Sequence, residues 1–460
     1  MKLDRIMIAA PKSGSGKTTI TCALLEALKN RGEQIVSYKC GPDYIDPMFH
    51  EQVIGIPSKN LDTFFSGEDV TRALFLKDRT EKDFVVMEGV MGLFDGLGGV
   101  REEGSSYHLA KVTETPIILV IDAKGMGRSV IPLISGFLAY DHAHLIQGVI
   151  LNRMSLSYYE IIKPLIEDEL NVRVLGYFPD QKDLHIESRH LGLVMPGELA
   201  GIQKRLQAVS EELEKTVDVE SIKHTARQAK EILIAHGQRS LERCHEGIAG
   251  SRPVIAVARD EAFCFYYEDN LLMLQENGAE IKYFSLIHDT ELPDGCNAIL
   301  IGGGYPELYA KELSANVRMR KAVKQAFHKG MPVVAECGGF MYLHEVIIDK
   351  DGVSHAMAGV VPAACRYQGK LVRFGYVEIR EKQSIFLPEG ELIKGHEFHY
   401  FDSTDNGESC IAAKPTTGRA YSCVIESENN WMGFPHLYYP SNPAFAKSFV
   451  EKAKAYKKII

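Results

Sequence analysis

The chain has 460 residues, of which 45% are hydrophobic and 25% are charged, as in an ordinary globular protein. One hydrophobic core does not serve so long a chain, so two domains of roughly 200 residues each are expected. The formal net charge of −9 argues against nucleic acid as the main partner, because phosphate backbones bind basic surfaces. A local basic patch for a small anion is compatible with this average.

Cysteine usage and hydropathy predict a cytoplasmic protein. The nine cysteines show no CxxC pair and no metal-finger spacing, which is typical of reduced thiols. The apolar stretch 6–10 is too short for a signal peptide, and no apolar run approaches the roughly 18 residues of a membrane helix. We therefore expect no membrane partner, and the sequence leaves a homodimer open.

The first 195 residues alternate short apolar strands with amphipathic helices. Strands are predicted at 5–10, 34–38, 84–87, 117–121, 147–151 and 173–177, and the first helix at 17–30. This alternation predicts an α/β fold whose mostly parallel sheet has helices on both faces and ligands at the carboxyl ends of its strands. Residues 196–250 have a helical apolar rhythm and no strand pattern, which predicts a helical linker.

A second α/β domain is predicted for residues 251–460. Its strands begin with PVIAVARD after Arg252 and continue at 281–284, 298–301 and 332–335. Helical segments separate these strands, and after Val353 the pattern becomes mostly strand and turn.

A glycine-rich loop, PKSGSGKT at 11–18, follows the first predicted strand and opens the first helix. In that context the backbone N–H groups of the loop turn toward phosphate oxygens, and the helix N-terminus adds favourable partial charge. Lys17 is expected to reach the terminal phosphates of ATP, Thr18 to hold Mg²⁺, and Asn152 to contact adenine after its strand. The predicted ATP-binding residues are Lys12, Ser13, Gly14, Ser15, Gly16, Lys17, Thr18 and Asn152.

Acidic residues follow the second and third predicted strands. Asp43 and Asp46 lie in GPDYIDP, and Glu88 and Asp95 lie in EGVMGLFDG. Because parallel strands end at the same edge of a sheet, these carboxylates are expected to coordinate Mg²⁺ or to position a substrate carboxylate. Ordinary turn and N-cap carboxylates are the alternative.

Cys337 lies between an apolar strand at 332–335 and two glycines that open a helix. A nucleophile at such a turn is exposed, and the next backbone N–H can stabilise an oxyanion. The GGGYPE segment, after another strand, offers further N–H groups. The predicted oxyanion residues are Gly303, Gly304 and Gly338. A buried structural cysteine is the alternative interpretation.

A thiol nucleophile needs a base, and two segments offer histidines. His396 and His399 lie in GHEFHYF, and His436 lies in FPHLYYPSNP. The residue pattern does not choose between the two segments, and a lone histidine is often structural.

Together these motifs resemble the cobyrinic acid a,c-diamide synthase family over nearly the whole chain. The matching segments are APKSGSGKTT, KCGPDYIDP, NLD, EGVMGLFDG, ARDEAFCFYYEDNL, GGGYPE, AECGGFMYL, GHEFHY and HLYYPSNP. The resemblance implies an ATP-binding domain like that of dethiobiotin synthetase, followed by a class I glutamine amidotransferase domain. Lys12 matches the extra lysine of the deviant phosphate-binding loops in the dethiobiotin synthetase and MinD-like families.

The resemblance implies a division of chemistry between the two domains. Cys337 would release ammonia from glutamine with His436 as its base, while His396 and His399 line the site. ATP and Mg²⁺ would phosphorylate the a and c acetate carboxylates of cobyrinic acid, and ammonia would attack the acyl phosphate. Most class I amidotransferases carry a glutamate two residues after the histidine; here that position is Tyr438, which suggests a Cys–His dyad.

Two other functions stay open. The motifs separate a Ni-sirohydrochlorin a,c-diamide synthase poorly from the cobyrinic acid enzyme. The segments GPDYIDP and YYEDNL argue against cobyric acid synthase. A MinD-like ATP switch would explain Lys12 but leaves Cys337 and the GGGYPE segment without a role.

Overall fold

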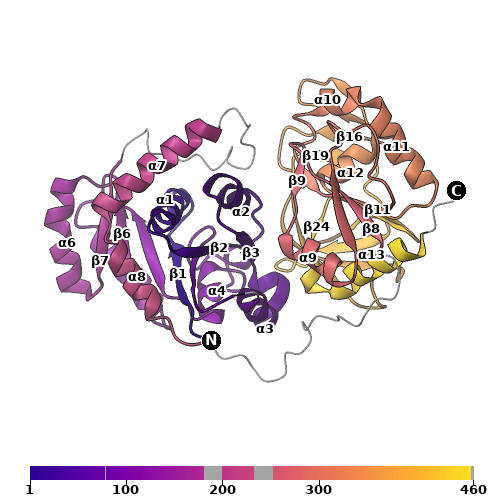
Figure 1. Cartoon of the computed structure of the whole chain (residues 1–460). Coiled ribbons are helices and arrows are strands. Elements are labelled where there is room, and N and C mark those ends of the chain that lie inside the picture. The colour runs from indigo at the N-terminus through magenta and orange to yellow at the C-terminus, as the bar shows by residue number, and fades with distance from the viewer. Residues whose placement is uncertain (78, 181–198, 233–251, 457–460) are drawn as a thin grey trace. The chain divides into compact units, whose positions relative to one another are not determined.

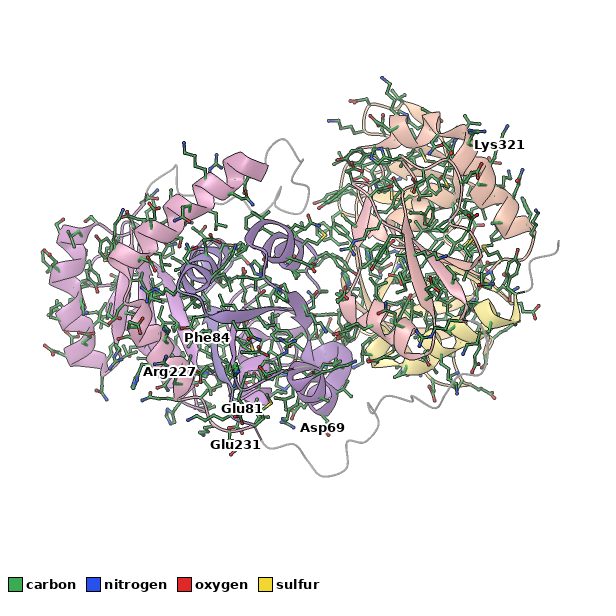
Figure 2. The ribbon with its side chains drawn as sticks, viewed as in Figure 1. Asp69, Glu81, Phe84, Arg227, Glu231 and Lys321 are labelled. Atoms are coloured by element: carbon green, nitrogen blue, oxygen red, sulfur yellow. The ribbon has the colours of Figure 1, made fainter. Side chains whose placement is uncertain are left out.

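The computed structural model describes residues 1–77, 79–180, 199–232 and 252–456. Its chain divides into two compact units, Met1–Leu241 and Glu242–Ile460 (Figure 1). Charged side chains such as Asp69, Glu81 and Lys321 are exposed, whereas Phe84 is buried (Figure 2). No helix among the described residues has the length and apolar character that crossing a membrane requires.

The first unit is built on a seven-stranded parallel sheet with the strand order β3-β2-β4-β1-β5-β6-β7. The strands are β1 Asp4–Ala9, β2 Gln34–Cys40, β3 Ser58–Leu61, β4 Asp83–Glu88, β5 Ile117–Asp122, β6 Ile146–Asn152 and β7 Val174–Phe178. The helices are α1 Lys17–Asn30, α2 Ile45–Phe49, α3 Thr63–Leu76, α4 Ser106–Val112, α5 Val130–Tyr140, α6 Leu156–Leu170, α7 Leu199–Thr216 and α8 Val219–Arg227. The α/β class and the six strands predicted for this half are confirmed, and β3 is an additional edge strand.

Helices α7 and α8 belong to the first unit. Leu206, Val209 and Leu213 of α7 join the same apolar cluster as Ile6 of β1, and α7 packs along α1 (Figure 1). The expectation of a linker over 196–250 is therefore wrong for these two helices, because their apolar face is buried in the core of the first unit. The expected boundaries at 195/196 and 250/251 lie outside the described residues.

The second unit has a central six-stranded sheet with the order β10-β8-β11-β13-β23-β22. Its strands are β8 Val254–Ala258, β10 Glu280–Phe284, β11 Cys296–Ile301, β13 Val333–Glu336, β22 Ile425–Ser427 and β23 Asn430–Gly433. They pair in parallel, except that β22 is antiparallel to β23. The helices are α9 Glu268–Glu276, α10 Ala310–Ala315, α11 Val317–His328, α12 Gly338–Leu343 and α13 Pro443–Ala455.

Three smaller sheets complete the described part of the second unit, and most of their strands follow Val353, in keeping with the strand-rich pattern predicted there. One pairs β9 Phe263–Phe265 with β12 Gly303–Gly304. The second contains β14 His344–Ile348, β15 Ser354–Ala356, β16 Val361–Tyr367 and β19 Phe401–Ser403. The third contains β17 Arg373–Glu381, β18 Ile393–His399, β20 Cys410–Ala413, β21 Ala420–Cys423 and β24 His436–Leu437.

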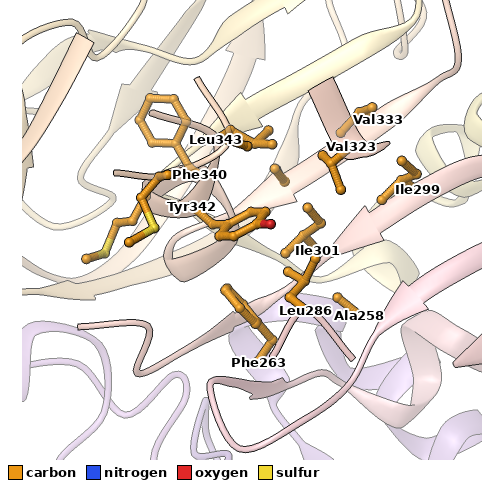
Figure 3. Packing of buried hydrophobic residues seen from close by; sticks show 14 of the residues in the cluster. Ala258, Phe263, Leu286, Ile299, Ile301, Val323, Val333, Phe340, Tyr342 and Leu343 are labelled. Atoms are coloured by element: carbon orange, nitrogen blue, oxygen red, sulfur yellow. The ribbon is translucent and has the colours of Figure 1, made fainter. Parts of the chain in front are cut away.

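The short helix α12 is anchored in the main core of the second unit. Phe340 and Leu343 of this helix lie in the same buried cluster as Ile301 of β11 (Figure 3). The ring of Tyr342 meets that of Phe263 edge-on, with 5.7 Å between centroids. This packing fixes the turn that precedes α12, which is the turn that carries Cys337.

Candidate functional site

The glycine-rich loop lies between β1 and α1, as predicted. Gly14 and Gly16 have φ values of 75° and 94°, in the left-handed region that favours glycine. A Cβ on Gly16 would also lie 2.1 Å from Asn152 Nδ2. Glycine is therefore required at position 16 both for its backbone conformation and for the close approach of β6.

Asn152 and Arg153 support this loop from the end of β6. Asn152 Nδ2 donates to the carbonyl oxygen of Ser15 at 2.8 Å, and Arg153 Nη2 donates to that of Gly14 at 2.8 Å. Arg153 Nη1 pairs with Asp122 Oδ2 at 2.8 Å. The side chain of Asn152 thus contacts the backbone of the predicted loop. Arg153 was not among the predicted residues, although it directly follows Asn152.

The side chain of Lys17 folds back over the glycine-rich loop. Its Nζ donates to the carbonyl oxygens of Lys12 at 3.2 Å and Met91 at 2.5 Å. Burial lowers the pKa of Lys17 to about 8, and the charge of Lys39 contributes to this shift. The charges of Glu88, Asp46 and Asp95 only partly offset this shift, and a bound phosphate would add further negative charge beside the ammonium.

Four of the predicted residues meet around Lys39. Lys39 Nζ lies 2.5 Å from Asp46 Oδ2, 2.8 Å from Glu88 Oε1 and 3.9 Å from Asp43 Oδ2. Thr18 Oγ1 donates to Glu88 Oε1 at 2.7 Å. The structure therefore joins the end of β2, the turn after it, the end of β4 and the phosphate loop in one polar site.

Burial sets the charge states in this polar site. It raises the pKa of Glu88 to about 7, and the neighbouring Asp46 adds to the shift. Burial alone would lower the pKa of Lys39, but Asp46 and Glu88 outweigh it and raise this pKa well above its ordinary value. Three carboxyl groups thus share one ammonium within 4 Å, so acidic groups outnumber the cation in this polar site.

Behind the polar site, two buried atoms lack a hydrogen-bond partner. They are Glu88 Oε2 and His50 Nε2, which lie 3.7 Å apart. Burial lowers the pKa of His50 to about 4, so this imidazole is neutral at physiological pH.

Asp95 lies on the side of the phosphate loop. Its Oδ2 accepts a hydrogen bond from Gly92 N at 2.9 Å, and its charge opposes in part the lowering of the Lys17 pKa. A Cβ on Gly92 would lie 2.5 Å from both Asp95 Oδ2 and the carbonyl oxygen of Pro11. Asp95 therefore shapes the turn after β4 where that turn touches the phosphate loop.

In the second unit, Cys337 occupies a strained turn between β13 and α12. Its φ of 48° and ψ of −103° are unfavourable for a residue with a side chain. Cys337 N donates to the carbonyl oxygen of Gly433 at 2.8 Å, which ties the turn to β23. Burial raises the pKa of the Cys337 thiol well above its ordinary value, and the charge of Glu307 adds to this shift. The thiol therefore needs a base.

The predicted oxyanion glycines converge next to this turn. A Cβ on Gly338 would lie 3.1 Å from Gly304 N, and Gly339 N donates to the carbonyl oxygen of Gly302 at 2.9 Å. A Cβ on Gly303 would lie only 2.2 Å from His436 Cε1. The glycine segment 302–304 therefore touches both the turn of Cys337 and the ring of His436.

A second contact links the sequence neighbours of Cys337 and His436. Glu336 Oε2 accepts a hydrogen bond from Leu437 N at 3.3 Å. Burial raises the pKa of Glu336 to about 8. The structure thus brings the segments of the candidate nucleophile and base to the same place.

Comparisons with known proteins cover both units. The CobQ/CobB/MinD/ParA nucleotide binding domain matches residues 6–194, and the CobB/CobQ-like glutamine amidotransferase domain matches residues 254–440. Proteins named cobyrinate a,c-diamide synthase are 39% identical in Thermoplasma volcanium, 37% in Dehalococcoides mccartyi and 36% in Salmonella typhimurium. These alignments cover 97–100% of this chain and 98–99% of the relatives. This chain belongs to the cobyrinate a,c-diamide synthase family.

Family membership confirms several expectations from the sequence. The nucleotide-binding domain supports the use of ATP, and the amidotransferase domain identifies a glutamine-dependent, amide-forming ligase. A MinD-like switch does not account for the amidotransferase match over residues 254–440.

In this family member the three candidate histidines are not equivalent. Side chains alternate along β18, so His396 and His399 point to opposite faces of the strand. The His396 ring stacks on that of His436, with 4.8 Å between centroids and 16° between planes. The His399 ring stacks on Phe434 at 4.0 Å and donates from Nδ1 to the carbonyl oxygen of Phe401 at 2.6 Å.

The FYYEDN segment, in sequence terms only a family signature, supports the thiol site. Tyr266 OH accepts from Gly302 N at 2.8 Å, and Tyr267 OH lies 3.1 Å from His396 Nδ1. Asn270 Nδ2 donates to the carbonyl oxygen of Leu437 at 2.8 Å, and Asn270 Oδ1 accepts from Tyr439 N at 2.8 Å. Two tyrosines and an asparagine just before and within α9 were a visible signal, but their distant partners were not.

Proposed function

We propose that this chain is a cobyrinate a,c-diamide synthase. It would convert the a and c acetate carboxylates of cobyrinic acid to amides with ATP and glutamine, in cobalamin biosynthesis. The observation that carries this proposal is the full-length match of both units to relatives of that name, at 36–39% identity.

In the second unit, Cys337 is the proposed nucleophile and His436 the proposed base. The sulfur attacks the side-chain amide carbon of glutamine while the thiol proton moves to His436. The C–N bond then breaks, the proton goes to the departing ammonia, and a thioester remains that water hydrolyses to glutamate and free thiol. The backbone N–H groups of Gly303, Gly304 and Gly338 would stabilise the oxyanion of the tetrahedral intermediate.

Burial explains how this pair is kept in its resting state. It raises the pKa of the Cys337 thiol and lowers the pKa of His436 to about 3, so both groups are neutral without substrate. Charge then develops only when the sulfur bonds to carbon and the negative charge moves to the amide oxygen. The site therefore favours reaction with bound glutamine over adventitious thiolate chemistry.

In the first unit, the phosphate loop and Lys17 would hold the phosphates of ATP. The residues fit Mg²⁺, because the cluster around Lys39 carries excess carboxylate and the Thr18 hydroxyl lies 2.7 Å from Glu88 Oε1. Thr18 and Glu88 would hold the ion, which neutralises phosphate charge when bound. Among the described residues no group of three or more His, Cys, Asp or Glu could hold a metal alone, which is compatible with an ion also bound by phosphates and water.

The remaining acidic residues have different proposed roles. Lys39 holds Asp46 and Glu88 in place and partly offsets the rise that burial causes in the pKa of Glu88, while Asp43 is less buried and available to an incoming substrate. A carboxylate of the tetrapyrrole takes the terminal phosphoryl group of ATP and becomes an acyl phosphate. Ammonia then attacks the carbonyl carbon and inorganic phosphate leaves, because phosphate is the better leaving group.

The decisive experiment offers cobyrinate and Ni-sirohydrochlorin side by side, each with ATP, Mg²⁺ and glutamine. We expect mass spectrometry to show the diamide of cobyrinate, with ATP and glutamine consumed in proportion. Amide product from the nickel tetrapyrrole alone would overturn the proposed substrate and favour the nickel enzyme of the same class.

Two other expectations remain predictions. A homodimer is testable by light scattering of the purified protein at several concentrations. The cytoplasmic location is testable by cell fractionation.

A further inference from the structure

The position that would carry an orienting glutamate does not serve that purpose here. It is occupied by Tyr438, whose hydroxyl donates to Asp269 Oδ2 at 3.1 Å. If His436 is the base, as in the proposed function, another group must fix the plane of its ring, since rotation about the ring-bearing bond is otherwise broad.

The ring of His436 adjoins His396, whose pKa burial keeps well below its ordinary value, and Gly303; the charge of Glu397 also acts on His436. His396 lies directly opposite on β18, in register with His436 on β24, and the two imidazoles stack at 4.8 Å and 16°. At Gly303 the absence of a side chain leaves room for the ring, because a Cβ there would lie 2.2 Å from His436 Cε1. His396 and His436 are 6% and 2% exposed, so water does not compete for these contacts.

His396 is in turn fixed by the segment before α9. Tyr267, itself 2% exposed, places its hydroxyl 3.1 Å from His396 Nδ1. The Tyr267 ring meets that of Tyr438 edge-on at 5.2 Å and 89°. The segment before α9 therefore contacts the His396 imidazole directly, and Tyr438 packs against that segment.

The nearby carboxylate of Glu397 is a poor substitute for the missing glutamate. It neighbours His396 in sequence, so strand alternation directs it to the opposite face of β18. There Tyr421 OH donates to Glu397 Oε2, which also lies 3.7 Å from Lys414 Nζ, and Arg373 Nη1 lies 3.8 Å from Glu397 Oε1.

We propose that His396, held by Tyr267, is the positioning residue for His436 and replaces the orienting carboxylate by ring stacking. This inference rests on the proposed function of Cys337 and His436. A stacked, buried and neutral imidazole holds the plane of the base without stabilising its protonated form as a carboxylate would. The base then passes its proton readily to the departing ammonia.

The test is the glutaminase reaction of the full-length protein. We expect His396→Leu to lower kcat by about 10- to 100-fold, because a base displaced by about 1 Å loses that much. The KM for glutamine should stay within about threefold, since His396 does not touch the substrate in this scheme. His396→Phe restores a flat ring and should recover at least half of the loss on a logarithmic scale.

Tyr267→Phe should cause a smaller loss, of about three- to tenfold, because it removes the hydroxyl and keeps the ring. The matched control is Phe398→Leu, an exposed aromatic residue two positions along the same strand face, which should keep the wild-type kcat. Thermal melting and ammonia-driven amidation monitor the fold.

Four results separate the positioning role of His396 from the proposed function of Cys337 and His436. Wild-type kcat in His396→Leu, or no recovery in a folded His396→Phe, would overturn the positioning role and leave the proposed function intact. If His396→Leu does not fold, an unchanged kcat in Tyr267→Phe would overturn the role instead. Glutaminase activity that survives in Cys337→Ala would contradict the proposed function itself.

Discussion

The two candidate sites use burial in opposite ways. In the first unit, buried Lys39 keeps its charge because Asp46 and Glu88 lie within 2.8 Å. In the second unit, buried Cys337 and His436 lose theirs, because burial raises the pKa of the thiol and lowers that of the imidazole to about 3. Burial suppresses charge where partners are few and strengthens pairing where they are many.

This difference matches the two kinds of chemistry. Phosphoryl transfer begins with a highly charged reactant, so its site needs fixed charges before the substrate arrives. Attack on an amide begins with neutral groups, so its site needs backbone donors placed where charge will appear. A substitution in the thiol site should therefore lower glutaminase activity and leave ammonia-driven amidation intact. A substitution in the ATP site should lower amidation and leave glutaminase activity intact.

The largest expected effect is that of Cys337→Ala. Loss of the nucleophile should lower glutamine-dependent amidation by at least about 10³-fold, because the proposed thioester forms on the Cys337 sulfur. Amidation driven by ammonium salts should stay near the wild-type rate. Cys423→Ala, another buried free cysteine of the second unit, is the matched control. Equal loss with both nitrogen sources would show that the thiol also supports the synthetase reaction.

Glu88→Gln should produce the reverse pattern. The amide cannot pair with Lys39 or hold a divalent cation as a carboxylate does, so amidation from either nitrogen source should fall by about 10²-fold or more. Glutaminase activity should change little. Asp83→Asn is the matched control, since this buried carboxylate lies at the other end of β4 and pairs with Gln34 and Arg79. A larger loss of glutaminase activity than of amidation would contradict the assignment of Glu88 to the ATP-dependent reaction.

Substitution of one glycine in each site tests the same separation of the two reactions by steric means. Gly16→Ala and Gly303→Ala each place a Cβ within 2.2 Å of a site side chain, Asn152 Nδ2 and His436 Cε1 respectively. We expect about 10-fold or greater losses, in ATP-dependent amidation for the first and in glutaminase for the second, because each displaces a functional group. Gly136→Ala, on α5 with no atom within 4 Å of the added Cβ, should be neutral. Exchanged phenotypes would refute the assignment of the two reactions.

Much of the fold could be predicted because the central strands of both sheets are buried on both faces. Such strands are continuous apolar runs, and Ile6, Met7 and Ile8 of β1 are all 0% exposed. The edge strand β3 escaped prediction because SKNL is short and mostly polar. The role of α7 was misjudged because periodicity shows that a helix has an apolar face but not which core will cover it.

The candidate site was predictable where function follows from a local motif. Gly16, Thr18 and Cys337 needed only their strand–turn–helix context. Lys39 was missed, because a lysine at a strand end acquires its role from carboxylates contributed by other segments. The pairing of His396 with His436 depends on the β18–β24 register, which no local pattern specifies.

The smallest expected effect is on the pH dependence of kcat/KM for ATP, which reports groups of the free enzyme. Glu88, with a pKa raised to about 7, must be ionised, so the rate should rise with pH through about 7. Lys17, with a pKa lowered to about 8, must be protonated, so the rate should fall above about 8. Each limb should change the rate by up to about tenfold per pH unit.

The same measurement on glutaminase sharpens the comparison between the two sites. Because burial lowers the pKa of His436 to about 3, kcat/KM for glutamine should show no limb near the ordinary histidine value of about 6.5. Substitution Glu88→Gln should remove the acidic limb for ATP and leave the glutamine profile unchanged. A histidine-like limb for glutamine that persists in Glu88→Gln would mean that charge, and not its suppression, governs the thiol site as well.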